Sequence, residues 1–523
     1  MIKQLFTFAF IILGSLLAMG QKEQLEWGEL KGNSGNLIEI MPLNGKDFYT
    51  LRWKGGNAFG GYYLSRYTDL KEVKSKRVSI AVNYNIANFE DVIIVDEHPS
   101  VILTNIKDGK EQVYLQQYSY ELEPRGEAKL LANYDIQKGM SKEDIKIIQS
   151  KDKEYFAVLW LLIGRKKDHD VYGYAIYNKK FKLMDQGEYE IPFESRYSQL
   201  THHLLSNTGD YFFVIKEFEP NQTRGLNQPD LMYKNMHIFQ VNDGELKNYT
   251  LPFQGKRVEA ISVNTNDSSS YIITGVYGAN EFNGAQGVFY MKLDFKNQAI
   301  TQQSFHEFDK DFITEDWTKR EKERAERREA RGVDEPSLYN YQMREAQLLP
   351  DGSMIGIMEQ NYVVVSTFSD VRSIMTISYT YYYNDIVLFK INKDGAFGWV
   401  TKVKKSQIST NDGGPFSSFA SISDSSTIRL IFNDNIENYD EQGKYIPKSE
   451  NYTRFSKRYN TVALVEVDVK SGEQKRNTLF SRKETKTIAV PKLFKVDMNS
   501  KEMLLYTMLN GRELYGILNI GNQ

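Results

Sequence analysis

A short antiparallel hairpin recurs along the chain, and this repeat constrains the fold more than any other feature. Each copy has an apolar strand, a polar turn and a second strand rich in Phe, Tyr, Ile, Leu and Val. Residues 346–403 show the unit most clearly, because they carry a Pro-Asp-Gly turn at 350–352 and a Gly-containing hairpin turn at 392–395. The repeat therefore predicts units of four antiparallel strands.

The hairpin occurs eight times, and a third strand follows it each time. The first five turns lie 53 to 59 residues apart, which is close to the roughly 40–50 residues of a propeller blade. Later steps are longer because of insertions. The turns are centred near Asn44, Glu97, Lys151, Thr208, Asp267, Asp351, Asp424 and Asn499, and the third strands cover residues 62–64, 113–115, 172–175, 236–239, 288–291, 386–389, 462–465 and 514–517.

The two ends of this array complement each other. The eighth unit stops at Gln523 after its third strand, while residues 24–31 form a spare alternating strand. Radial repetition, with the first strand completing the last blade, hides the edges that antiparallel sheets must protect. We therefore predict an all-β protein in which residues 21–523 form an eight-bladed β-propeller closed by its N-terminal strand. Seven blades and two adjacent β-sandwich domains are the alternatives.

Residues 1–20 have the features of a secretory signal peptide. Lys3 precedes an apolar segment over residues 5–19, and Ala18-Met19-Gly20 resembles a cleavage site. The apolar segment is shorter than the roughly 20 residues that a membrane-spanning helix needs. The pattern predicts export to the periplasm or the cell exterior, with no integral membrane segment. The chain has no cysteine, which excludes disulfides and a lipid attached to cysteine.

Long loops gather on one predicted face of the ring. In a four-stranded blade, the loop between the second and third strands opens on the same face as the link to the next blade. We call this the loop-rich face, because binding residues usually lie on loops held by a rigid scaffold. It receives the long loops 216–235, 275–287, 359–384 and 433–460, and the longest link, residues 309–341, between blades five and six.

That link contains the one convincing helix, predicted over residues 314–331. Thr314 is a suitable N-cap and Gly332 a suitable stop. The segment has no apolar stripe, which favours a solvated helix over a docking arm for a partner. Favourable pairs four residues apart are Glu315 with Lys319, Asp316 with Arg320, and Glu323 with Arg327.

Three polar and aromatic segments of blades six and seven form the candidate binding site on this face. Their carboxylates and amides suit a hard cation such as calcium or the hydroxyls of a sugar, and the tyrosines offer stacking surfaces. Alternatively, these Asn and Asp residues cap backbone groups between the blades. The candidate residues are Tyr381, Tyr382, Tyr383, Asn384, Asp385, Asn411, Asp412, Asn433 and Asp434.

The same segments carry a family resemblance. The motifs are YYYNDI at 381–386, a strand with Trp399 and basic residues at 393–405, NDGG and FSSF within 411–419, and FNDN at 432–435. They resemble an uncharacterised group of exported propeller-like proteins of Gram-negative bacteria. The resemblance covers about a quarter of the chain, and it implies a shared fold and an inter-blade motif but no activity.

Signatures of known chemistry are sparse. The chain has neither a G-x-S-x-G motif nor a cysteine nucleophile. His202 and His203 lie on a predicted strand, where successive side chains face opposite ways and cannot share a metal. Residues 434–443 are acidic but lack the register of a calcium loop.

The charge balance and the candidate site together define the expected function. The 66 Lys and Arg residues against 68 Asp and Glu residues leave a net charge of −2, which argues against nucleic acid as a partner. We expect a non-catalytic propeller that binds a protein or a glycan through its loop-rich face. The alternative is a carbohydrate-active enzyme that uses paired carboxylates on the same face.

Overall fold

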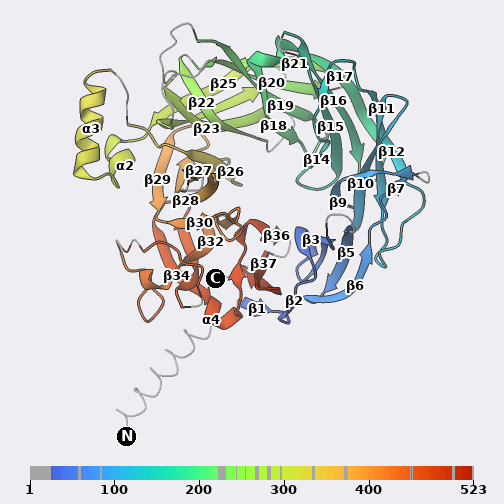
Figure 1. Cartoon of the computed structure of the whole chain (residues 1–523). Helices are drawn as coiled ribbons and strands as arrows, with labels where there is room; N and C mark the ends of the chain where they lie inside the picture. Colours follow the sequence, from blue (N-terminus) through green and yellow to red (C-terminus); the bar gives the residue numbers. More distant parts are fainter. Residues whose placement is uncertain are drawn as a thin grey trace.

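A computed structural model shows eight antiparallel sheets arranged in a ring (Figure 1). It describes residues 25–520 except 57–59, 83–84, 166, 222–230, 243, 254, 266–269, 280–283, 295–296, 298, 333–335, 370–374, 448, 450, 457 and 498–500. The all-β, eight-bladed propeller is confirmed, and each predicted hairpin and third strand lies in its own blade. The predicted signal peptide lies outside the described residues, as do two turn centres, Asp267 and Asn499.

The first four blades follow one another along the chain. Blade one consists of β3 (Asn36–Asn44), β4 (Asp47–Lys54), β5 (Gly61–Thr68) and β6 (Lys71–Arg77). Blade two consists of β9 (Asn88–Val95), β10 (His98–Lys107), β11 (Lys110–Gln117) and β12 (Lys129–Asp135). Blade three consists of β13 (Ser141–Lys142), β14 (Lys146–Gln149), β15 (Tyr155–Ile163), β16 (His169–Asn178) and β17 (Leu183–Glu194). Blade four consists of β18 (Ser198–Leu205), β19 (Tyr211–Pro220), β20 (Leu231–Asn242) and β21 (Glu245–Leu251).

The other four blades complete the ring. Blade five consists of β22 (Lys256–Asn264), β23 (Ser270–Ala279), β24 (Gly287–Asp294) and β25 (Ala299–Glu307). Blade six consists of β26 (Tyr341–Leu348), β27 (Met354–Ser369), β28 (Met375–Ile391), β29 (Phe397–Val403) and β30 (Gln407–Thr410). Blade seven consists of β31 (Ala420–Ser423), β32 (Thr427–Asn435), β33 (Asn460–Asp468) and β34 (Gln474–Ser481). Blade eight consists of β35 (Ile488–Ala489), β36 (Lys495–Asp497), β37 (Glu502–Leu509), β38 (Arg512–Asn519), β1 (Leu25–Trp27) and β2 (Lys31–Gly32).

A few short elements lie between or beside the blades. β7 (Ala81–Val82) and β8 (Asn85–Ile86) form a separate small hairpin. The helices are α2 (Lys310–Thr314), α3 (Lys319–Glu329) and α4 (Arg482–Thr485), and the 3-10 turns are η1 (Ser195–Tyr197), η2 (Ile436–Asn438) and η3 (Pro491–Leu493). No helix in the described ranges has the length and apolar character needed to cross a bilayer.

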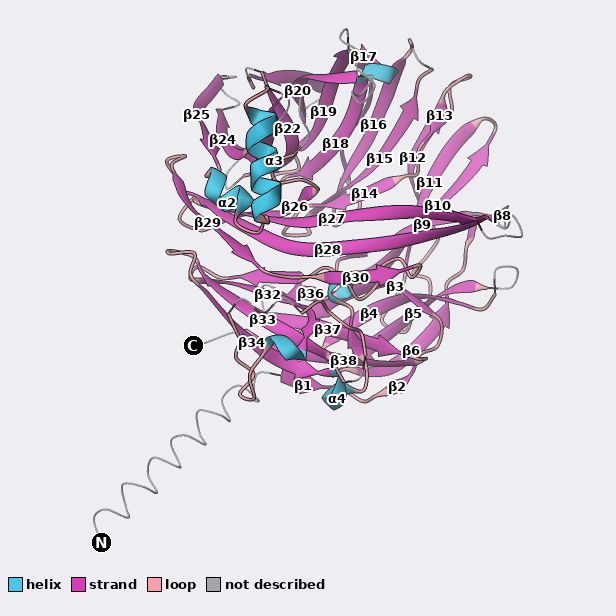
Figure 2. Cartoon of the chain, turned by 60° about the vertical axis from the view of Figure 1, so that its left-hand side comes forward, coloured by secondary structure: helices cyan, strands magenta, loops and turns pink. Residues whose placement is uncertain are grey.

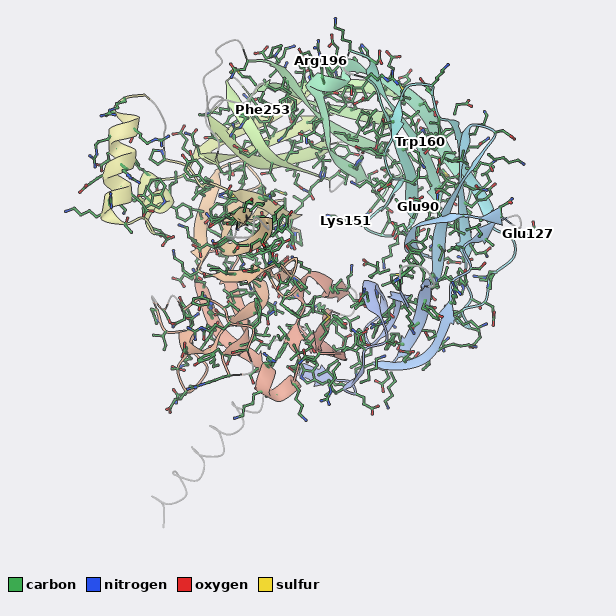
Figure 3. The ribbon with its side chains drawn as sticks, in the orientation of Figure 1. Glu90, Glu127, Lys151, Trp160, Arg196 and Phe253 are labelled. Carbon is green, nitrogen blue, oxygen red and sulfur yellow. The ribbon has the colours of Figure 1, made fainter. Side chains whose placement is uncertain are left out.

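The core lies between the blades rather than in one central mass. Each hydrophobic cluster of the described residues joins two neighbouring sheets, and together the clusters cover all eight seams. Sheets covered on both faces need nearly continuous apolar strands, and β15 with the sequence YFAVLWLLI is such a strand. In Figure 3, Lys151 in the inner turn of blade three lies near the ring axis, Trp160 within the blade, and Glu127 at the outer rim.

The N-terminal strand closes the ring, as the sequence predicts. β1 pairs with β38, and Trp27 is directly opposite Gly516. The ring of Trp27 occupies the space above this glycine, where a Cβ atom would lie 2.4 Å from the indole. Beneath the seam, Arg52 of blade one donates to Glu513 of blade eight at 2.7 Å, and both side chains are 1% exposed. A buried ion pair of this kind strongly disfavours any opening that separates its partners.

The predicted helix over residues 314–331 is wrong in its start. Thr314 ends α2, where its hydroxyl donates to the Lys310 carbonyl at 2.9 Å. The longer helix α3 begins after Thr318, because Thr318 and Glu321 cap each other's backbone N–H groups in a capping box. A Thr with a Glu three residues later satisfies two backbone donors, whereas Thr314 offers no such pair.

The start of this insertion is anchored, whereas α3 has no buried residue. Ile313 is buried, and Phe312 and Trp317 pack against the core between blades five and six. The expected pairs of Glu315 with Lys319 and of Asp316 with Arg320 are replaced by ion pairs to Lys402 of β29, at 2.9 and 3.0 Å. The third expected pair, Glu323 with Arg327, is present at 3.8 Å.

Candidate functional site

A polar pocket of about 270 Å³ lies between blades six and seven. Blade six contributes the base of the β27–β28 hairpin and the link after β29. Blade seven contributes the end of β32 and the loop between β32 and β33, and the segment that follows α2 completes the walls. These are the segments that the sequence assigns to the loop-rich face, with one residue added from β34. The lining residues are Asp316, Gln360, Asn384, Asp385, Lys404, Lys405, Ser406, Asp434, Asn438, Ser449, Asn451 and Arg476.

A buried charged network supports the pocket from behind. The carboxylate of Glu359, in β27, is fully buried and accepts from Arg344 at 2.7 and 2.9 Å and from Lys405 Nζ at 2.9 Å. Burial alone would raise the pKa of Glu359, but Lys405 and Arg344 hold this pKa below its usual range. Ser418 also donates to Glu359, at 2.8 Å. The network therefore fixes the link between blades six and seven against the hairpin.

Asp434 is held by four donors and is nearly inaccessible. It is 1% exposed, and it accepts from Tyr439 Oη at 2.6 Å and from Asn438 Nδ2 at 3.0 Å. It also accepts from the Asn435 N–H at 2.8 Å and forms an ion pair with Arg476. Because these contacts occupy both oxygens, Asp434 positions Arg476 and the Asn438 loop instead of presenting a free carboxylate.

Asp385 is the more available carboxylate of the pocket. Its side chain is 20% exposed, and one oxygen accepts from the Lys405 N–H at 2.9 Å. Its other oxygen is 3.6 Å from Lys404 Nζ. Burial raises the pKa of Asp385, although the neighbouring lysines oppose this effect. A partly exposed carboxylate that keeps unshared lone pairs can accept hydrogen bonds from a ligand.

Asn384 lines the pocket and donates to Gln360 Oε1 at 3.1 Å, whereas the other three predicted Asn and Asp residues cap backbone groups. Asn411 accepts from the Tyr379 N–H at 2.8 Å, and Asp412 accepts from the Gly414 N–H at 2.8 Å. Asn433 is fully buried and donates to the carbonyls of Phe416 and Ala489, both at 2.8 Å. These contacts agree with the capping alternative raised by the sequence, because each side chain satisfies a main-chain group between strands.

Of the three carboxylates that the sequence offers to a hard cation, two line the pocket and one does not. Asp385 and Asp434 line the pocket, whereas Asp412 turns back onto its own loop. Within the described ranges, no three His, Cys, Asp or Glu side chains are grouped as metal ligands. The paired Arg476 already neutralises Asp434, so that this carboxylate is not available to a hard cation.

The three predicted tyrosines have different surroundings. Tyr382 stacks on Tyr362 with ring centroids 4.7 Å apart. Tyr383 lies under Lys492 Nζ, which is 4.3 Å from its ring centroid. Tyr381 is half-buried in β28, opposite Val363. None of the three lines the pocket, and their rings lie along the hairpin beside it.

Sequence reasoning missed the cations of the pocket. Arg476 lies in the outer strand of blade seven, and Lys404 and Lys405 follow β29. Asp434 ends a buried strand, and an unpaired buried carboxylate is costly, so a cation is expected beside it. The sequence offers many Lys and Arg residues, however, and no spacing rule that selects Arg476.

Comparisons with solved structures find β-propeller proteins at low identity. An apocarotenoid oxygenase from Synechocystis has 10% identity and a TM-score of 0.32 over 87% of this chain and 92% of its own. The polysaccharide lyase Uly1 has 9% identity and a TM-score of 0.39 over 93% and 90%. An acylaminoacyl peptidase from Pyrococcus horikoshii has 9% identity and a TM-score of 0.34 over 91% and 58%. Scans with family models and of curated proteins find no match, and these likenesses assign no activity to this chain.

Proposed function

We propose that the protein is an exported, non-catalytic propeller that binds a glycan through the pocket between blades six and seven. The observation that carries this proposal is the lining of the pocket. All twelve lining side chains are polar, and they offer carboxylate, amide, hydroxyl and ammonium groups within one small volume. Such a set can donate to and accept from the several hydroxyls of one sugar residue.

The charges of the pocket favour a neutral ligand. Three Asp side chains are matched by Lys404, Lys405 and Arg476, so the lining carries no net charge. A strongly charged ligand would gain little from such a surface, whereas hydroxyl groups gain charge-assisted hydrogen bonds from both signs. The tyrosines along the adjoining hairpin, such as the exposed Tyr379, add surface on which further sugar rings can stack.

A carbohydrate-active enzyme is the second candidate, and the raised pKa of Asp385 is the observation that favours it. Glycoside hydrolysis usually needs two working carboxylates that flank the scissile bond. Asp434 is already bound by Arg476, Tyr439 and the Asn435 backbone, so it is unsuited to act as base or nucleophile. Binding without turnover is therefore the better supported function. The other possible ligand is a protein partner that inserts a polar group into the same pocket.

A matched pair of substitutions tests this proposal. Asp385→Asn removes a charge from the pocket, and Asp412→Asn makes the same change outside it. Binding to a glycan panel is measured first for the mature wild-type protein, and calorimetry then gives the affinity for the best ligand. Loss of a charged hydrogen bond costs about 1.5–3 kcal/mol, so Asp385→Asn is expected to weaken binding roughly tenfold to a hundredfold.

The control variant Asp412→Asn shows whether a loss of affinity is specific to the pocket. Asp412→Asn keeps an oxygen that can accept from Gly414, so its glycan affinity and melting temperature are expected to equal those of the wild type. Equal losses in the two variants would place the binding site elsewhere. Release of sugar products by the wild type, abolished in Asp385→Asn, would support the enzyme instead.

A further inference from the structure

The hairpin of β27 and β28 extends well beyond blade six. β26 pairs with β27 only as far as Gln360, and β29 pairs with β28 only from Ile386. Residues 361–369 and 375–384 therefore continue as a two-stranded arm, supported at its base by β30. Figure 2 shows β27 and β28 as a long pair of strands that reaches the edge of the molecule.

One edge of this arm has unpaired backbone groups. The Asn361 N–H donates outward, to the Asn340 carbonyl at 2.9 Å. Because strand geometry alternates, the N–H and C=O groups of Val363, Val365 and Thr367 also point outward, away from β28. Among the described residues, no strand pairs with this edge. The outward backbone groups of these three alternate residues thus form a template for another strand.

The side chains of the arm leave the edge unprotected. The arm contains no charged residue over 361–369 and 375–384, in a chain that is 26% charged. Exposed edges are usually blunted by lysine, proline or a bulge, because such edges otherwise pair with other chains. Large apolar side chains are also exposed on the arm: Val363, Val364, Val365, Ile377 and Tyr379 are each 41–56% exposed. Both features indicate a surface that is covered in the working protein.

We propose that this edge pairs with the same edge of a second copy of the chain. An antiparallel pairing about a two-fold axis at Val365 places Val365 opposite its own copy and Val363 opposite Thr367. Each outward N–H then finds a carbonyl of the other copy, and the two arms form one continuous sheet. Side chains directly opposite lie close enough to pack, and valine and threonine suit such pairs.

The chemistry of the arm favours a second copy over an unrelated strand. A two-fold axis places every residue near its own equivalent, so a charged edge would repel itself. The uncharged sequence from Asn361 to Thr367 brings no like charges together. A β-branched or hydroxyl-bearing residue also meets a similar residue at each position from Val363 to Thr367. The proposed pairing uses the backbone edge of residues 363–367, and none of these residues lines the pocket.

Sedimentation of the mature full-length protein over a hundredfold concentration range tests the proposal. The wild type is expected to approach twice the monomer mass as the concentration rises. Val365→Lys places two ammonium groups opposite each other on the axis and is expected to raise the dissociation constant at least about tenfold. Ile86→Lys, a control at an 82% exposed residue of β8, is expected to leave it unchanged. Unaltered melting temperatures would show that both variants are folded.

Cross-linking gives a second readout, because the chain has no cysteine of its own. Paired strands bring opposite Cα atoms to about 5.5 Å, which is within the range of a disulfide. Val365→Cys is therefore expected to form a covalent dimer under mild oxidation, and Ile86→Cys is not. A wild type that stays monomeric at every concentration would overturn the proposal. So would a dimer that Val365→Lys leaves intact, or one that forms only with an added peptide or lipid.

Discussion

His203 illustrates how burial decides what a single side chain does. Its Nδ1 lies 2.9 Å from the hydroxyls of Tyr172 and Tyr211. Burial, aided by repulsion from Lys146, lowers the pKa of His203 to about 3. The sequence excluded a metal shared with His202 because neighbours on a strand face opposite ways. The two tyrosine partners come from β16 and β19, and no local pattern could identify them.

This pKa makes the stability of the protein pH-dependent. An unfolded histidine has a pKa of about 6.5, so between about pH 6.5 and 3 the unfolded chain binds a proton that the folded protein does not. Stability is therefore lost as the pH falls through this window, by up to about 1.4 kcal/mol per pH unit. Urea unfolding from pH 4 to 8 is expected to show a weaker pH dependence in His203→Gln. The same slope in this variant and in the wild type would contradict the assignment, and His169→Gln on the surface serves as control.

Residue identities were predictable where the contact was local. The cap that Asp412 makes on the Gly414 N–H follows from its turn sequence, because Asp bonds to backbone groups two residues on, whereas Asn411 meets the Tyr379 N–H across 32 positions. The pairing of Asp434 with Arg476 was not predictable, because the two residues are 42 positions apart and meet through strand packing. The structure corrects the sequence at such long-range contacts.

At the scale of elements, periodicity predicted the strands and missed what lies between them. Apolar residues at every second position marked each inner hairpin, because these strands must be apolar to fill the space between neighbouring blades. The start of α3 was missed because two threonines compete as N-cap, and only Thr318 has the partner Glu321. The prediction of a loop over residues 359–384 was wrong, because its valines and tyrosines have strand propensity and extend β27 and β28 beyond the blade.

The closing strand is the element on which the ring depends. Removing residues 25–32 from the mature chain exposes the outer edge of β38 and takes away the contact of Trp27 with Gly516 and Phe480. Loss of that half-buried ring alone is expected to cost about 2 kcal/mol or more. Thermal unfolding with light scattering is expected to show a lower melting temperature and earlier aggregation. The single variant Trp27→Ala separates the packing loss from the exposed edge, and a truncated protein as stable as the full chain would contradict this account.

At the scale of the whole molecule, ring closure and site formation differ in how far the sequence specifies them. Eight similar units with complementary ends leave few ways to hide every sheet edge, so the propeller followed from the repeat. The loop-rich face followed from connectivity, and the pocket lies there. Its composition did not follow, because Asp316, Asp385 and Arg476 come from different blades or links. Only the packing of blades six and seven brings them together.

The most direct test of the proposed site is a crystal structure of the mature protein soaked with the best-binding oligosaccharide from the panel. We expect one ordered sugar residue in the pocket, with a hydroxyl within hydrogen-bond distance of Asp385 and another near the Asn438 and Asn451 loop. Sugar density at another place on the ring, with this pocket left empty at the same ligand concentration, would contradict it.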